Sequence, residues 1–116
     1  EAFATPIMRL AYGGVTEEIL ARYGLMSGLA IAVSIIVKHR STALGLAIIL
    51  SSFIFGLGHL PAIVAFFPDA PSIFLVKTVI LNTAIAALFA IVFVQHSLEA
   101  SMASHIGFHL ALVAIG

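Results

Sequence analysis

The sequence contains no cysteine and few charged side chains, and both absences restrict its chemistry. Without cysteine the chain has no disulfide framework, no thiolate metal ligand and no cysteine nucleophile. Five basic and five acidic residues give a formal net charge of zero, and the longest basic run is Lys38-His39-Arg40. Nucleic-acid binding needs a concentrated basic surface, so we expect no nucleic-acid partner.

What the sequence has in abundance is apolar side chains, at 62% of the 116 residues, with a mean hydropathy of +1.23. Ten charged side chains cannot supply the polar surface that a soluble domain of this size needs. We therefore predict an all-α integral membrane protein, a multi-pass bundle of about four transmembrane helices surrounded by membrane lipid. Because the chain starts at Glu1 rather than Met, we expect residues 1–116 to form a single transmembrane domain from a longer chain.

Four apolar stretches are long enough to cross a hydrocarbon core. Gly13-Gly14 should end any preceding structure, and Thr16 before two acids has the pattern of a helix N-cap. Pro61 should end the second helix, and the three prolines within residues 61–72 indicate a loop. The predicted helices are 17–37, 43–60, 73–94 and 98–115.

Several ionisable residues fall in one half of the bilayer if successive helices alternate in direction. The helical rise places Glu17 and Glu18 roughly 28 to 30 Å from the basic turn that follows the first helix, and His59 roughly 27 Å from it. His105 and His109 lie roughly 14 and 20 Å deep in the fourth helix, measured from the same side. Buried ionisable groups in lipid need polar partners, so we expect these five side chains to gather.

Residue spacing indicates two pairs within this set. Four-residue spacing places His105 and His109 on one helix face and lets Glu18 pair with Arg22 along the first helix. Glu17 and Glu18 point about 100° apart around a helix, so one acid can face the histidines while the other holds Arg22. The sequence leaves open which acid has which role.

Each feature taken alone also has a plainer interpretation. Two acids after Thr16 can be a helix start favoured by the helix dipole. His59 can be an interfacial histidine at a helix end, and Phe55 can be a packing residue. The case for a functional site depends on the combination.

These residues form an ordered set that resembles a known family of membrane proteins. Three motifs on three predicted helices carry the resemblance: Glu17-Glu18-x-x-x-Arg22, Phe55-x-x-x-His59, and His105 followed four residues later by His109. The set is similar to the CAAX prenyl endopeptidase and bacteriocin-processing family of intramembrane glutamic-type proteases, also called the ABI family. The family pattern ends in Asn or Asp where this chain has His109. The resemblance implies supporting roles for Arg22 and Phe55, and a location in a prokaryotic cell membrane.

The resemblance also implies a mechanism and a substrate class. Glu17 or Glu18 would activate a water molecule with help from His59, while His105 and His109 would stabilise the oxyanion. The activity would be that of a peptidase without a cofactor, acting on a peptide or protein that can be prenylated. A neutral imidazole at His109 donates from only one nitrogen, whereas an Asn amide both donates and accepts.

Three other functions remain open from the sequence. His59, His105 and His109 with one Glu would supply a zinc ligand set for a metal-dependent version of the same hydrolysis. A silent relative could bind a peptide or protect against a bacteriocin without catalysis. A proton or ion carrier could use the same polar cluster.

Overall fold

The structure describes residue 8 and residues 10–116, and this part of the chain consists of helices joined by short connections. In this computed structural model, four helices are long and apolar enough to cross a membrane, which confirms the all-α transmembrane prediction. Residues 1–7 and 9, the beginning of the expected domain, lie outside the described residues. The four spans are Tyr12–Ile36, Arg40–Phe66, Ser72–Gln95 and Leu98–Ile115.

The first span begins earlier than predicted and is partly π-helical. It comprises η1 (Tyr12–Glu17), η2 (Ile19–Met26) and α2 (Ser27–Ile36), with i→i+5 bonding in the two π segments. The predicted start at Thr16 is therefore wrong, because Thr16 lies inside η1 and caps nothing. Both acids of the first motif consequently lie within a spanning helix and not at its exposed end.

The predicted break at Gly13-Gly14 is also wrong, and the reason is close helix packing. Both glycines are buried, and they lie against the last helix of the chain. A Cβ at Gly13 would approach His109 Nε2 to 3.0 Å, and one at Gly14 would overlap the side chain of Ile106. Small residues that admit a neighbouring helix are common in membrane bundles.

The second span contains a proline without ending there. It is made of α3 (Arg40–Gly58) and α4 (Leu60–Phe66), so the predicted loop at 61–72 is wrong over its first six residues. Pro61 occupies the first turn of α4, where a backbone N–H has no helical acceptor and its absence costs nothing. The connection to the third span is limited to residues 67–71.

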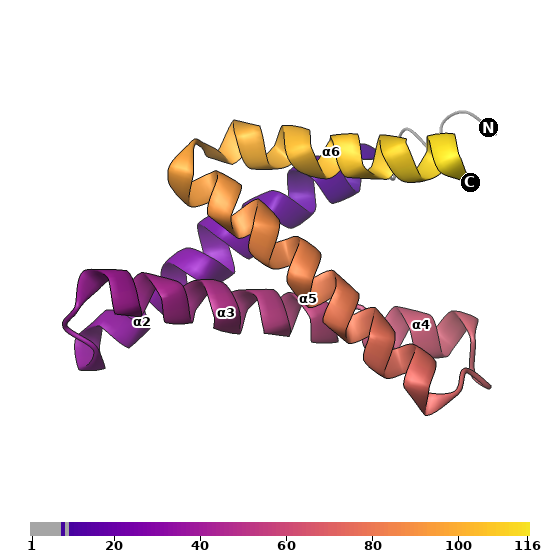
Figure 1. Cartoon of the computed structure of the whole chain (residues 1–116), viewed down its shortest axis with the longest axis horizontal. Coiled ribbons are helices and arrows are strands. Elements are labelled where there is room, and N and C mark those ends of the chain that lie inside the picture. The colour runs from indigo at the N-terminus through magenta and orange to yellow at the C-terminus, as the bar shows by residue number, and fades with distance from the viewer. Residues whose placement is uncertain (1–7, 9) are drawn as a thin grey trace.

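The third and fourth spans are α5 (Ser72–Gln95) and α6 (Leu98–Ile115), joined by a short turn. The turn ends at Ser97, whose side chain accepts a hydrogen bond from the Ala100 N–H at 3.1 Å and caps α6. Figure 1 shows α5 crossing obliquely between α3 and α6, while the first span runs from α6 to α3. The first span therefore contacts both the second and the fourth.

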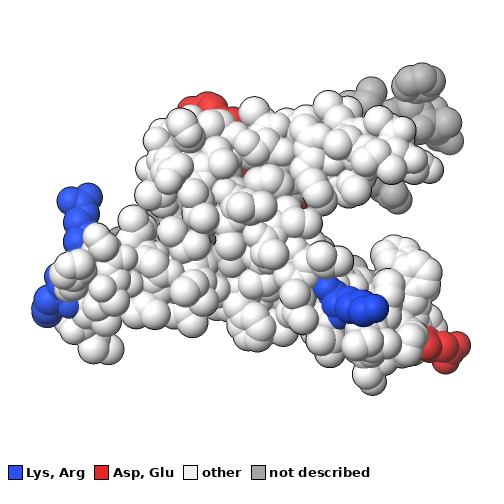
Figure 2. Space-filling model, in the orientation of Figure 1, with Lys and Arg blue, Asp and Glu red and all other residues white. Residues whose placement is uncertain are grey.

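The interior is small and the surface is apolar, as expected of a bundle in lipid. Fully or nearly fully buried alanines, among them Ala47 and Ala90, pack with Met26 in the core. Large apolar side chains are exposed along every span, and Figure 2 shows charged groups on only a few parts of one face. In water such a surface would aggregate, whereas in a bilayer it contacts acyl chains.

Gly56 provides a test of this packing. A Cβ at Gly56 would lie 2.9 Å from the Val79 carbonyl oxygen and would overlap Thr83 Oγ1, whereas a Cβ at Gly45 on the same helix meets nothing within 4 Å. We expect Gly56→Ala to lower the free energy of unfolding by about 1–3 kcal/mol through overpacking against α5. Gly45→Ala should be neutral or stabilising by up to about 1 kcal/mol. Thermal unfolding in detergent measures both, and equal effects would contradict the described α3–α5 contact.

Candidate functional site

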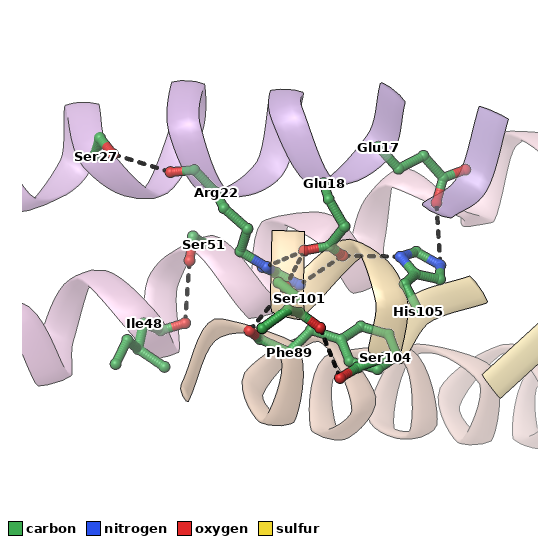
Figure 3. A network of polar contacts seen from close by, with 11 residues as sticks. Glu17, Glu18, Arg22, Ser27, Ile48, Ser51, Phe89, Ser101, Ser104 and His105 are labelled. Atoms are coloured by element: carbon green, nitrogen blue, oxygen red, sulfur yellow. Dashed lines mark hydrogen bonds and ion pairs between the residues drawn. The ribbon is translucent and has the colours of Figure 1, made fainter. Parts of the chain in front are cut away.

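The centre of the bundle contains a fully buried carboxylate, that of Glu18, with three polar partners. Arg22 donates to it from Nε at 2.9 Å and from Nη2 at 3.4 Å. His105 Nδ1 lies 2.8 Å from Oε1, and the Ser101 hydroxyl donates to Oε2. Figure 3 shows these groups converging from the first span and α6. The two carboxylate oxygens are thus shared among partners from two distant parts of the chain.

Arg22 is as deeply buried as its acid, and the two form an ion pair out of contact with solvent or lipid. The Arg22 guanidinium also lies over the Phe55 ring, with its carbon 5.8 Å from the ring centroid, a cation–π contact. Removing one member of a buried pair leaves an uncompensated charge, which typically costs about 3–5 kcal/mol. The pair predicted from the four-residue spacing is present, and it depends on its neighbours.

Ser101 connects the acid to the third span. Its Oγ lies 3.0 Å from the Phe89 carbonyl oxygen and also within hydrogen-bonding distance of Glu18. One hydroxyl hydrogen serves one acceptor at a time, and the carboxylate is the stronger of the two. Ser101 therefore brings α5, α6 and the first span together at one point.

Glu17 has a different environment from its neighbour. Its side chain is 29% exposed, and its Oε2 lies 3.8 Å from His105 Nε2, which is beyond direct hydrogen-bond distance. Glu17 also lines a pocket of about 490 Å³ between the first and second spans. The expected division, with one acid facing the histidines and the other holding Arg22, is wrong. Glu18 contacts both Arg22 and His105, because its two oxygens bind different partners. Glu17 faces accessible space.

His59 lines the same pocket from the junction of α3 and α4. Its Nδ1 lies 2.9 Å from the Phe55 carbonyl oxygen, and its ring packs against Phe55 with centroids 4.8 Å apart. A carbonyl can only accept, so Nδ1 carries the hydrogen and Nε2 of the neutral ring has a free lone pair. Phe55 therefore holds the His59 ring in one orientation, in addition to packing against it.

The two histidines of α6 stack on one another beside Glu17. The His105 and His109 centroids are 4.9 Å apart with an interplanar angle of 21°, and Phe89 covers the other face of His105 at 4.7 Å. His109 is only half-buried, and Gly13 leaves space for its ring edge. The one-face prediction from their spacing agrees with this stack.

The geometry does not gather the residues named for zinc. Within the described part of the chain, no three His, Asp or Glu side chains lie close enough to hold a metal ion. The rings of His105 and His109 are stacked nearly parallel, so their in-plane lone pairs do not converge on one point. His105 Nδ1 is already engaged by Glu18.

Sequence reasoning missed three residues of this site: Gly13, Phe89 and Ser101. Ser101 precedes His105 by four residues, so it shares a helix face with the histidines, and that spacing was the available signal. Gly13 was misread because paired glycines usually indicate a helix break, whereas here Gly13 lies inside a helix and makes room for His109. Phe89 contributes a backbone carbonyl and a ring face, neither of which a sequence pattern identifies.

The fold and site define a multi-pass helical membrane protein with a buried Glu–Arg–His cluster beside an accessible acid. Comparison with protein families matches residues 2–111 to the family described as type II CAAX prenyl endopeptidase Rce1-like. The chain therefore belongs to this protease family, and the resemblance inferred from the three motifs is confirmed. No significant match is found among curated proteins or among solved structures.

Two serines on α6 test the buried network. Ser101→Ala removes a hydrogen bond to a buried carboxylate, so the free energy of unfolding should fall by about 1.5–3 kcal/mol. Ser104 donates only to Ala100 of its own helix at 2.9 Å, and Ser104→Ala should stay within about 0.5 kcal/mol of the parent. Unfolding in mixed micelles distinguishes them. A Ser101→Ala variant as stable as Ser104→Ala would mean that the contact with Glu18 contributes nothing.

Proposed function

We propose that this protein is an intramembrane peptidase in which Glu17 is the general base and Glu18 is a positioning residue. The observation that carries this assignment is the unequal environment of the two adjacent acids. Glu18 has no exposed surface and its oxygens are occupied by Arg22, Ser101 and His105. Glu17 is part-exposed and shares a pocket with His59.

The proposed reaction is hydrolysis by an activated water molecule. The Glu17 carboxylate accepts one proton from water. The free Nε2 of His59 accepts a hydrogen bond from the other O–H, which stays on the attacking oxygen, and so aligns the oxygen lone pair. The water oxygen attacks the scissile carbonyl carbon and forms a tetrahedral oxyanion. Glu17 then returns the proton to the leaving amine as the C–N bond breaks, so that acid and amine products leave the site.

We propose that the stacked histidines, His105 and His109, stabilise the oxyanion. His105 Nδ1 donates to Glu18, and a ring that also carries a proton on Nε2 presents a second N–H on the Glu17 side. The charges of Glu17, Glu18, Arg22 and His105 then sum to zero, which suits a cluster surrounded by lipid. Each donor aimed at an oxyanion typically contributes about 3–4 kcal/mol to the barrier reduction. His109 adds a second imidazole at the half-exposed end of the stack.

The substrate we propose is a peptide that carries an apolar or prenylated segment. Apart from Glu17 and His59, the pocket is lined by apolar residues of the first and second spans, including Leu20, Leu25 and Ala62. Leu20 is strongly exposed, so the pocket wall is continuous with the surface that contacts lipid. Moving an apolar chain from the bilayer into this pocket should therefore cost little free energy.

Substitution of Glu17 tests the proposal. In a reconstituted peptidase assay, Glu17→Gln should lower the rate of the chemical step by about 10²–10⁴-fold, because the amide cannot accept the water proton. Glu99→Gln is the matched control, since Glu99 is exposed in the first turn of α6. Glu99→Gln should cleave at the parent rate.

A chelator arm separates the hydrolytic mechanisms. A Glu17→Gln variant with parent activity would exclude Glu17 as the base. If a chelator abolishes the activity of the parent protein and zinc restores it, the metal-dependent mechanism is favoured. A parent protein that binds the peptide without cleaving it would favour the silent binder.

A further inference from the structure

A second pocket lies at the opposite end of the first two spans, far from the site described above. It has a volume of about 370 Å³ and lies where α2 ends and α3 begins. Its lining residues come from both helices and from the connection between them: Ala30, Ile31, Ser34, Val37, Lys38, Arg40, Ala43 and Leu44. Apart from Ser34 the walls are apolar, and the two cations, Lys38 and Arg40, lie at the end of the pocket nearest the membrane surface.

Neither Lys38 nor Arg40 has an acidic partner in the part of the chain that the structure describes. Among residue 8 and residues 10–116, no carboxylate lies within ion-pair distance of Lys38 or Arg40. Both side chains are exposed, and Figure 2 shows basic side chains where α2 meets α3, with the acidic groups of that face elsewhere. Asp69 is the sole acid between Arg22 and Glu99 in the sequence, and it lies in the turn at the other end of α3–α4.

The backbone at this end also favours an anion. Lys38 Nζ lies 3.4 Å from the Ser34 carbonyl oxygen, so the ammonium covers the carbonyl end of α2 and offsets its partial negative charge. The first N–H groups of α3 have no side-chain cap, and their partial positive charge faces the same connection. Two full positive charges and a helix N-terminus therefore surround the mouth of an apolar groove.

We propose that this groove binds an anionic phospholipid, with its phosphate between Lys38 and Arg40 and one acyl chain between α2 and α3. The connection between the first two spans lies at a membrane surface, where headgroups are present at high local concentration. A free phosphate would use the cations and leave the groove unfilled, whereas a phospholipid matches both the charge and the apolar wall. The proposal is independent of catalysis, because none of its residues belongs to the Glu17 pocket.

The test is lipid binding to the purified full chain in detergent, measured by native mass spectrometry with dioleoyl phosphatidylglycerol and dioleoyl phosphatidylcholine. One basic side chain near an anionic surface is worth about fivefold in affinity, so the two cations should make the parent prefer phosphatidylglycerol by about 25-fold. Lys38→Gln with Arg40→Gln should abolish this preference. Lys77→Gln, which removes an exposed cation at the other end of the bundle, should keep it.

Two further arms test the groove itself. Ser34→Leu places an apolar side chain in the groove, leaves the charges unchanged and should weaken the binding of both lipids. Glycerol phosphate carries the headgroup charge without an acyl chain and should fail to compete. The proposal is overturned if the parent binds both lipids equally, if the double variant keeps the preference, if Lys77→Gln loses it, or if glycerol phosphate competes. Thermal unfolding of each variant measures whether a variant that fails to bind lipid is still folded.

Discussion

The structure depends on the compensation of one buried carboxylate, that of Glu18. Removing a carboxylate and a guanidinium from water costs several kcal/mol per ion, and Arg22 alone leaves carboxylate lone pairs unsatisfied. The missing partners, Ser101 and His105, lie 83 and 87 residues away in the sequence. The first span and α6 must therefore dock to satisfy this group. The same docking places Glu17, His105 and His109 beside one another.

The two adjacent acids, Glu17 and Glu18, differ in burial and in hydrogen-bond partners. Glu18 is held by so many partners that it cannot exchange protons with a substrate without breaking the network. Glu17, one residue earlier on the π-helical first span, stays part-exposed in a pocket that His59 also lines. In the mechanism we propose, this arrangement lets Glu18 hold the neighbouring side chains in place while Glu17 stays reachable by water.

The sequence predicted the larger features well, because they follow from hydropathy and residue spacing. Four spans, the Glu18–Arg22 pair and the shared face of His105 and His109 were all inferred from patterns within a single helix. Features that depend on contact between helices were missed or wrong. Gly13-Gly14 resembled a break because its neighbour on α6 was unknown. Pro61 resembled a helix end because its place in a new first turn depends on the turn at His59. The distinction between the acids needed the positions of Ser101 and His105.

The most direct test of the account is whether the first span and α6 are docked by the Glu18 network. The natural chain has no cysteine, so an introduced pair reports their proximity without background. A Cβ at Gly14 lies 3.3 Å from Ile106 Cβ, close to the disulfide range of about 3.5–4.5 Å. Gly14→Cys with Ile106→Cys should cross-link rapidly under mild oxidant, and far more slowly once Glu18→Ala is added. No cross-link, or one that forms equally fast without Glu18, would contradict the account.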